Sequence, residues 1–334
     1  MKSWLLLVVF ALGCSTRDTL QTRPCDEAAP GVAVTCEMDG WDNRAYDAVI
    51  PDRTPPAAGL PVVIALHGGG GNRKAALRTT CPRGDIDAPE CLHAMGTDAG
   101  YLVVSPDGTA GGFAIGRTWN AGGGTGSWRC TSGFACEENI DDVKYFDDLL
   151  EDLDARFGID RDRVFVTGLS NGAAMAHRLA CQRADKIAAI APIGGALQYA
   201  TGAACEPTRP VAILDIHGSD DPCWKYAGGE SDCPVGQSGR NHVGVESSMT
   251  RWASIFGCVG EPQQDTLPNN ADDETIAVRR TWQGCGASLQ LIRIDGGGHT
   301  WPSGEPYLGE SLIGRVSQDF GNEVILGFFD RFPE

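Results

Sequence analysis

Ser170 lies at the centre of a Gly-Leu-Ser-Asn-Gly stretch at residues 168–172, a pattern that can turn a serine hydroxyl into a nucleophile. The apolar run 164–167 precedes this stretch and the alanine-rich run 173–180 follows it, so we expect a strand, a sharp turn and a helix in that order. Small residues on both sides of the serine relieve the crowding of such a turn. A buried turn serine is the alternative, and the context favours the nucleophile.

A serine hydroxyl is a weak nucleophile near neutral pH, so it needs a base to take its proton and a carboxylate to orient that base. His299 is the histidine that lies late in the chain on a glycine-rich loop, residues 296–302, directly after an apolar run. We therefore predict that His299 is the base. The other histidines receive structural interpretations: His177 packs on a helix, His67 and His217 hold turns at strand ends, and His93 and His242 lie at the surface.

Two neighbouring carboxylates follow the apolar run 211–216, at the sequence His-Gly-Ser-Asp-Asp. Ligands bind where the carboxyl ends of strands meet loops in open α/β sheets, which favours this position for the third member of a triad. We prefer Asp221, with Asp220 as the alternative. The chain order Ser170, Asp221, His299 is that of α/β hydrolases.

Backbone N–H groups that could hold an oxyanion come from two places. Asn171 follows the nucleophile at the start of a helix, and a glycine run at 68–71 follows the apolar run 62–66. We assign the second donor to Gly69, with Gly70 as the alternative. A phosphate-binding loop is disfavoured because the glycine run lacks the Gly-Lys-Ser/Thr ending.

The elements that must position these residues alternate between strand and helix along the chain. Expected strands cover residues 62–66, 101–105, 164–167, 187–193, 211–216 and 289–294, and expected helices cover 140–157, 171–181, 243–256 and 320–332. Several strands are apolar throughout, as in a sheet covered on both faces. We predict an α/β fold with a mostly parallel sheet, helices on both faces and one catalytic domain at residues 36–334.

Composition narrows the range of partners. The 334 residues are 42% hydrophobic and 21% charged, which is typical of a globular protein, and the net charge is −17. This charge disfavours binding to nucleic acid and to anionic lipid head groups. We expect a monomer that acts on an uncharged substrate, without a metal or an organic cofactor.

The N-terminal segment predicts export. Residues 1–14 combine a lysine with a short apolar run that is too short to span a bilayer, and residues 15–35 are expected to form a tether. The sequence Ala-Leu-Gly-Cys at 11–14 resembles a bacterial lipoprotein box, which implies a lipid anchor on Cys14. Ordinary cleavage before Cys14 is the alternative, so the protein is expected to be either secreted or anchored at the outer cell envelope.

Thirteen cysteines indicate an oxidising compartment. Without Cys14, twelve remain, and we hypothesise that each pairs with its nearest neighbour to close six short loops. A zinc site is disfavoured because the sequence contains no Cys-x-x-Cys pair.

These motifs resemble the polyhydroxybutyrate depolymerase and feruloyl esterase family of α/β hydrolases, including its bacterial lipoprotein-like members, over about residues 40–330. The matching sequences are Leu-His-Gly-Gly-Gly at 66–70, Trp-Asn-Ala-Gly at 119–122, Ile-Asp-Asp-Val at 140–143, the serine motif at 168–172, His-Gly-Ser-Asp-Asp at 217–221 and Gly-Gly-His-Thr-Trp-Pro at 297–302. The resemblance implies a serine carboxylic ester hydrolase, and it places the acid at Asp221.

The resemblance also implies that Trp119 and Trp301 lie near the mouth of the active site, where they would bind substrate. Packing within loops is the alternative for both. One departure from the family concerns the loop after Gly122, because cysteines return only at Cys130 and Cys136 and the shape of the loop stays open.

The natural ester is left open between a hydroxyalkanoate polymer and a feruloylated polysaccharide. Two other functions remain as alternatives to an esterase: a serine peptidase on the same fold, and a catalytically inactive envelope protein that binds polymers.

Overall fold

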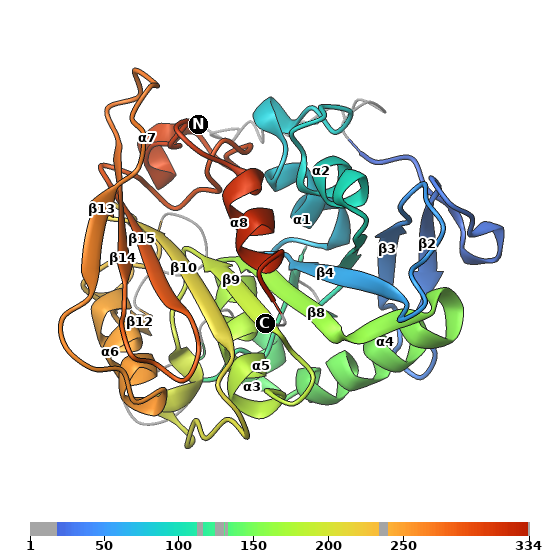
Figure 1. Ribbon diagram of the computed structural model, residues 1–334, viewed down its shortest axis with the longest axis horizontal. Helices are drawn as coiled ribbons and strands as arrows, with labels where there is room; N and C mark the ends of the chain where they lie inside the picture. The colour runs from blue at the N-terminus through green and yellow to red at the C-terminus, as the bar shows by residue number, and fades with distance from the viewer. Residues whose placement is uncertain (1–18, 112–115, 124–129, 131–132, 234–239, 333–334) are drawn as a thin grey trace, which may run out of the picture.

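One large sheet organises the chain. The computed structural model describes residues 19–111, 116–123, 130, 133–233 and 240–332 (Figure 1). The sheet has eleven strands in the spatial order β1-β2-β3-β5-β4-β8-β9-β10-β15-β14-β13. Its strands are β1 Arg23–Pro24, β2 Ala33–Glu37, β3 Ala45–Val49, β4 Leu60–Leu66, β5 Leu102–Pro106, β8 Ile159–Leu169, β9 Ala189–Ile193, β10 Ala212–Gly218, β13 Gln263–Thr266, β14 Ile276–Thr281 and β15 Leu289–Asp295.

The centre of the sheet is parallel. Strands β5, β4, β8, β9, β10 and β15 run in the same direction, whereas β3 pairs antiparallel with both β2 and β5, and β14 pairs antiparallel with both β13 and β15. All six strands expected from the sequence form this parallel centre, which confirms the predicted mostly parallel sheet. The antiparallel strands at the edges were not predicted; β13, for example, is exposed along its whole length and has no apolar run.

Helices cover both faces of the sheet, as predicted. Helices α4, α5 and α6 pack on one face and α1, α2 and α8 on the other, and each set encloses its own hydrophobic core (Figure 1). The helices are η1 Cys25–Glu27, α1 Arg73–Thr79, η2 Pro82–Gly84, α2 Leu92–Ala99, α3 Phe134–Glu137, α4 Asp142–Phe157, α5 Asn171–Gln182, η3 Gln198–Thr201, α6 Val245–Ile255, α7 Glu310–Ile313 and α8 Asn322–Phe329.

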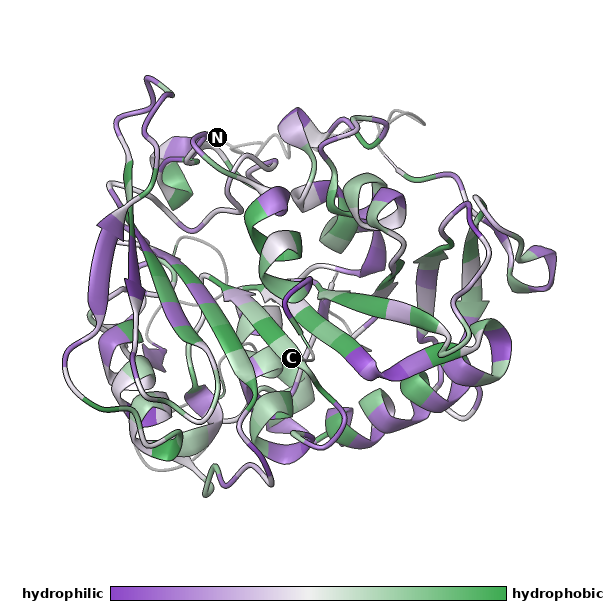
Figure 2. Ribbon diagram, in the orientation of Figure 1, coloured by the Kyte–Doolittle hydropathy of each residue, from purple (hydrophilic) through white to green (hydrophobic). Residues whose placement is uncertain are grey.

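Strand β4 shows why the centre of the sheet is apolar on both sides. Val62, Ile64 and Leu66 point to one core, while Val63 and Ala65 point to the other, because side chains alternate across a strand. Figure 2 shows that the central strands are largely hydrophobic, whereas β13 at the edge of the sheet is hydrophilic. Two short hairpins complete the fold, formed by β6 Thr109–Ala110 with β7 Arg117–Thr118 and by β11 Gly229–Glu230 with β12 Asn241–His242.

Within the described residues, six disulfides join each cysteine to its nearest partner along the chain, which confirms both the disulfide-rich character and the pairing expected from the sequence. The pairs are Cys25–Cys36, Cys81–Cys91, Cys130–Cys136, Cys181–Cys205, Cys223–Cys233 and Cys258–Cys285. Each closes a loop of 6 to 27 residues and so restricts mainly the unfolded chain.

The sheet begins earlier in the chain than the predicted boundary at residue 36. Strands β1 and β2 pair in parallel, and the Cys25–Cys36 disulfide joins them, so the second half of the segment expected to be a tether belongs to the fold. The expected export signal and Cys14 lie outside the described residues. No helix in the described part of the chain combines the length and apolar character needed to cross a membrane.

Candidate active site

Four loops bring the predicted site residues to the carboxyl edge of the parallel sheet. Ser170 directly follows β8, Asp221 follows β10, His299 follows β15, and the glycine run begins after β4. Strands β4 and β8 are neighbours, as are β10 and β15, and β9 joins the two pairs. This is the edge at which open α/β sheets bind ligands.

Ser170 occupies the tight turn expected between strand and helix. Ser170 lies between β8 and α5, and its φ of 59° and ψ of −116° are unusual for a residue with a side chain. The flanking positions have no room for a side chain. A Cβ on Gly168 would lie 2.7 Å from the carbonyl oxygen of Leu66, and a Cβ on Gly172 would lie 2.5 Å from it. The Gly-x-Ser-x-Gly pattern is therefore a packing requirement of β4 against the turn.

His299 and Asp221 form a short hydrogen bond. The distance from His299 Nδ1 to Asp221 Oδ2 is 2.6 Å, and both side chains are buried. The alternative acid, Asp220, is turned away, because its carboxylate accepts the hydroxyl of Ser219 at 2.8 Å in an exposed position. The geometry therefore favours Asp221 over Asp220 as the partner of His299.

The carboxylate of Asp221 has further donors. Its Oδ1 accepts the backbone N–H groups of Cys223 and Trp224, both at 2.7 Å, and its Oδ2 lies 3.3 Å from Nε2 of His217. Burial alone would raise the pKa of Asp221, but the charge of His299 and the hydrogen bonds from His217 and His299 outweigh it and hold this pKa well below its usual range. The carboxylate is thus ionised and fixed.

His217 does more than hold a turn. Its Nε2 donates to the carbonyl oxygen of Trp224 at 2.7 Å and also faces Asp221. Burial opposes a charge on His217, yet the hydrogen bond and the negative charge of Asp221 raise its pKa overall. The sequence analysis missed this contact, although the four-residue spacing from His217 to Asp221 was visible.

Backbone hydrogen bonds fasten the acid loop to the base loop. Asp220 N–H donates to the carbonyl of Gly297 at 2.9 Å, and Gly296 N–H donates to the hydroxyl of Ser219 at 2.9 Å. The loops pass so closely that a Cβ on Gly218 would lie 2.2 Å from the oxygen of Gly297. The loop that carries Asp221 and the loop that carries His299 are therefore held against each other.

The nucleophile turn and the base adjoin the same residue, Gly194, which follows β9. Ser170 N–H donates to the carbonyl of Ile193 at 2.8 Å, and a Cβ on Gly194 would lie 3.2 Å from His299 Nδ1. The same Cβ would lie 3.5 Å from a methyl carbon of Leu169. Gly194 therefore adjoins both His299 and Leu169, the residue before the nucleophile.

The glycine run lies beside the nucleophile. A Cβ on Gly68 would be 3.5 Å from Cβ of Ser170. Gly70 N–H donates to the carbonyl of Arg117 at 2.9 Å and Gly71 N–H donates to that of Gly68 at 3.0 Å. These bonds occupy the N–H of Gly70, so the geometry favours Gly69 as the donor to an oxyanion.

Asn171 and Trp119 are clamped together. The side-chain amide of Asn171 accepts Trp119 N–H at 2.7 Å and donates to Trp119 C=O at 3.0 Å. The indole N–H of Trp119 donates to the carbonyl of His67 at 3.0 Å. Trp119 therefore ties the start of the glycine run to the residue that follows the nucleophile.

The expected substrate-binding role of Trp119 and Trp301 requires a correction. Both side chains are only 2% exposed, and the indole N–H of Trp301 donates to Asn322 Oδ1 at 2.9 Å in the core. Buried rings with satisfied donors have no face for an ester, so the structure favours the packing alternative for both.

Ion pairs fix the segments that adjoin the glycine run. Asp107 accepts the N–H of Arg73 at 2.9 Å and its guanidinium at 2.7 Å, and Arg44 pairs with Asp142 at 2.7 Å. His67 joins the glycine run to the loop after β5, because its Nδ1 donates to Gly68 C=O and its Nε2 accepts the N–H of Gly108. Burial lowers the pKa of His67 to about 4, so the ring is neutral.

The remaining histidines lie in the interior. His177 is packed as expected, with Nε2 3.1 Å from Asp215 Oδ2 and Nδ1 accepting the indole N–H of Trp252 at 3.0 Å. The expectation that His93 and His242 lie at the surface is wrong, since they are 5% and 2% exposed. His93 packs within α2, and His242 stacks on an indole ring, which explains their burial.

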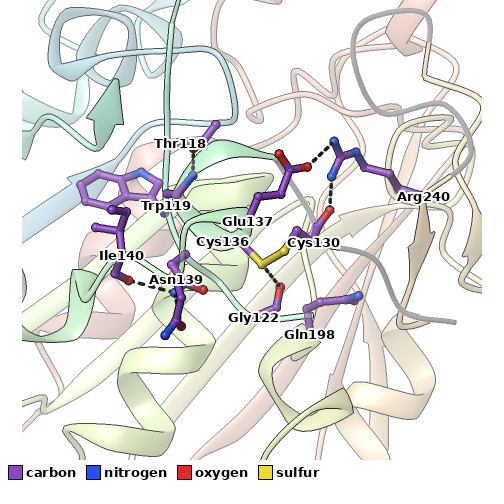
Figure 3. The surroundings of a disulfide bond; sticks show 12 residues. Thr118, Trp119, Gly122, Cys130, Cys136, Glu137, Asn139, Ile140, Gln198 and Arg240 are labelled. Atoms are coloured by element: carbon purple, nitrogen blue, oxygen red, sulfur yellow. Dashed lines mark hydrogen bonds and ion pairs between the residues drawn. A yellow bond between two sulfur atoms is a disulfide. The ribbon is translucent and has the colours of Figure 1, made fainter. Parts of the chain in front are cut away.

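The Cys130–Cys136 disulfide lies against Gly122, where the loop begins whose shape the sequence left open. Cys136 Sγ lies 3.5 Å from the carbonyl oxygen of Gly122, and Arg240 binds both the carbonyl of Cys130 and the carboxylate of Glu137 (Figure 3). The cysteine pair therefore lies beside the Trp-Asn-Ala-Gly loop even though the chain departs from the family spacing.

Within the described residues, one group of side chains has the spacing of metal ligands, namely Cys81, Cys91 and His93. The two sulfur atoms are joined in a disulfide, so they cannot act as thiolate ligands. This group therefore carries no metal chemistry.

Tyr307 is a residue that the sequence analysis did not identify. Its ring stands edge-on to that of His299, with centroids 6.2 Å apart and an interplanar angle of 83°, and 44% of the residue is exposed. Its hydroxyl lies 3.6 Å from Cys223 Sγ. No sequence motif marks it, because an isolated tyrosine in a loop has no periodic pattern.

Comparison with known proteins agrees with this architecture. A model of the phospholipase and carboxylesterase family matches residues 118–243. Among solved structures, an acetyl xylan esterase from Aspergillus awamori superimposes with a TM-score of 0.53 at 16% identity, covering 90% of this chain and 99% of that one. The sheet, the loop positions and this likeness define the α/β-hydrolase fold of the chain.

Its relatives by sequence include several feruloyl esterases. Feruloyl esterase B of Piromyces equi is 30% identical over 210 residues, which is 62% of this chain, and the chain spans only 35% of the length of that relative. Feruloyl esterase C of Emericella nidulans is 26% identical over 280 residues, 84% of each chain. The predicted resemblance to the feruloyl esterase type is confirmed, and the expected enzyme class, a carboxylic ester hydrolase, is supported by these relatives.

Proposed function

We propose that this chain is a serine carboxylic ester hydrolase in which Ser170 is the nucleophile, His299 the base and Asp221 the acid that orients the base. The observation that carries the proposal is the 2.6 Å bond between His299 and Asp221, at the sheet edge where Ser170 stands in a strained turn. A histidine whose Nδ1 is held by a carboxylate presents Nε2 as a proton acceptor.

The reaction proceeds in two acyl transfers. His299 takes the proton of Ser170 while its oxygen attacks the ester carbonyl, and the N–H groups of Gly69 and Asn171 hold the oxyanion. The proton then passes from His299 to the leaving alcohol, and an acyl-serine remains. A water molecule, deprotonated by His299, attacks the acyl carbon, and the acid leaves as Ser170 regains its proton.

Acyl esters of plant polysaccharides are the proposed natural substrates. The relatives named as feruloyl and acetyl xylan esterases support this class over hydroxyalkanoate polymers, and the net charge of −17 suits an uncharged ester. Six disulfides fit an oxidising compartment, so we place the enzyme outside the cytoplasm, secreted or anchored through Cys14.

The proposal is tested by substituting the nucleophile. We expect Ser170→Ala to fold normally and to lose turnover of p-nitrophenyl acetate and methyl ferulate by at least about 10³-fold. Ser254→Ala, at an exposed position of α6, serves as the matched control and should keep wild-type rates. Turnover retained in Ser170→Ala would remove the assignment.

A substrate panel separates the alternatives. Hydroxybutyrate oligomers test the depolymerase type, and a p-nitroanilide tests the peptidase. Faster hydrolysis of either one than of methyl ferulate would overturn the proposed substrate class, and a wild-type chain inert toward all of them would favour the inactive binding protein.

A further inference from the structure

We propose that Tyr307 is a platform for the alcohol part of the ester, and that this part is a sugar ring. The inference rests on the serine esterase function proposed above, and it names the side of the site at which the carbohydrate is held.

The position of Tyr307 relative to His299 assigns it to the alcohol side. The protonated base must transfer the proton on its Nε2 to the leaving alkoxide, so the alcohol part of the ester departs past Nε2 of His299. Tyr307 packs against that ring, edge-on, with centroids 6.2 Å apart. The proposal places a group bound to the leaving oxygen against Tyr307, where that group extends beyond His299.

The ring of Tyr307 is open to solvent although it lies beside a buried base. The described part of the chain has four exposed large hydrophobic side chains, Val259, Ile276, Tyr307 and Leu312, and Tyr307 is the one that packs on a proposed site residue. Leaving a tyrosine 44% exposed to water forgoes hydrophobic stabilisation that a bound ligand would recover.

Contacts on both sides of Tyr307 fix the platform in place. Glu305 N–H donates to the carbonyl of Thr79 at 3.0 Å, and Leu308 packs on a small cluster that contains the Cys223–Cys233 disulfide. The hydroxyl of Tyr307 faces Cys223 Sγ at 3.6 Å. Because Cys223 adjoins the hydroxyl, the proposal assigns the ring of Tyr307, and not its hydroxyl, to the ligand.

The chemistry of this surface favours a sugar. A sugar ring can lay the apolar face of its C–H groups on an aromatic ring while its hydroxyls stay in water, whereas a methyl group covers little of that ring. The net charge of −17 disfavours an anionic alcohol. An uncharged pyranose or furanose therefore fits the platform better than a small or charged alcohol.

The test compares two esters with the same acyl group, methyl ferulate and feruloyl arabinose. The measured quantity is the ratio of kcat/KM for the sugar ester to kcat/KM for the methyl ester. We expect Tyr307→Ala to lower this ratio about five- to tenfold, mainly through KM for the sugar ester. Tyr307→Phe should keep the ratio, because the ring face remains.

Ile276→Ala is the matched control, since it truncates a residue that is 45% exposed but belongs to β14. It should leave the ratio at the wild-type value. An unchanged ratio in Tyr307→Ala, or an equal fall in Tyr307→Phe, would overturn the platform. A wild-type chain that hydrolyses neither ester would instead refute the proposed function, so the two failures are distinguishable.

Discussion

Replacing Asp221 by asparagine should disable the site through the orientation of a single amide. Oδ1 of Asp221 accepts two backbone N–H groups at 2.7 Å, so in Asp221→Asn the amide oxygen must occupy that position. The amide NH₂ then faces His299 Nδ1, where the carboxylate lies 2.6 Å away in the native chain. A donor at that place forces the proton of His299 onto Nε2, and the base can no longer accept the proton of Ser170.

The expected loss in kcat is about 10⁴-fold, the size found when a triad aspartate becomes asparagine and fixes the wrong tautomer. Hydrolysis of p-nitrophenyl acetate measures it, and circular dichroism checks the fold. Asp220→Asn removes the same charge from the neighbouring exposed carboxylate and should stay within about twofold of wild type. A loss below tenfold in Asp221→Asn, or an equal loss in Asp220→Asn, would refute this reasoning.

Three further perturbations have defined outcomes. Cys223→Ser with Cys233→Ser should lower kcat about tenfold, measured on p-nitrophenyl acetate, because the disulfide holds one of the N–H donors of Asp221. Gly172→Ala should lower the free energy of unfolding, measured in urea, by about 3 kcal/mol or more, because the new Cβ would lie 2.5 Å from a carbonyl oxygen. Gly327→Ala is the control: its Cβ would meet nothing within 4 Å, so the free energy of unfolding should rise by about 0.5–1 kcal/mol. The pKa of His67 is about 4 in the folded chain and 6.5 in the unfolded chain, so the unfolded chain binds a proton first as the pH falls. Lowering the pH from 7 to 5 should therefore reduce the free energy of unfolding by about 2 kcal/mol through this residue.

Each of these has its own control. The double serine variant of Cys258 and Cys285 removes a disulfide that joins the loop after α6 to the connection between β14 and β15, at the opposite end of β15 from His299. This variant should lose stability while keeping kcat within about twofold. Equal losses of kcat in both disulfide variants would contradict a role in holding Asp221. For His67, the variant His67→Gln should be less stable at pH 7 but lose less than wild type on acidification; identical losses would assign the pH dependence to other groups.

Much of the fold was predictable because its central strands have strong patterns. The run 62–66 is apolar on both faces and became β4, and the serine motif marked the junction of β8 and α5. Strand β13 carries Gln, Gln, Asp and Thr, all exposed, and it is held by pairing with β14 rather than by burial. Its sequence therefore contains no signal that a pattern could reveal.

The candidate site was predictable where chemistry imposes residue types, and less so where packing decides. The sequence placed Asp221 and His299 on separate loops, and the structure joins them by a hydrogen bond. The tryptophans were misread, because a loop residue can be either exposed or buried, and the indole donors of Trp119 and Trp301 found partners far away in sequence. Such long-range partners follow from the tertiary fold alone.

Mass spectrometry after treatment with a fluorophosphonate probe tests the central claim most directly, because the probe labels only a serine that is activated by a base. The account predicts one adduct, on the peptide that contains Ser170, with labelling abolished in Ser170→Ala and slowed at least about 10³-fold in His299→Gln. Esterase activity in a chain whose Ser170 stays unlabelled, or labelling that His299→Gln leaves at the wild-type rate, would contradict it.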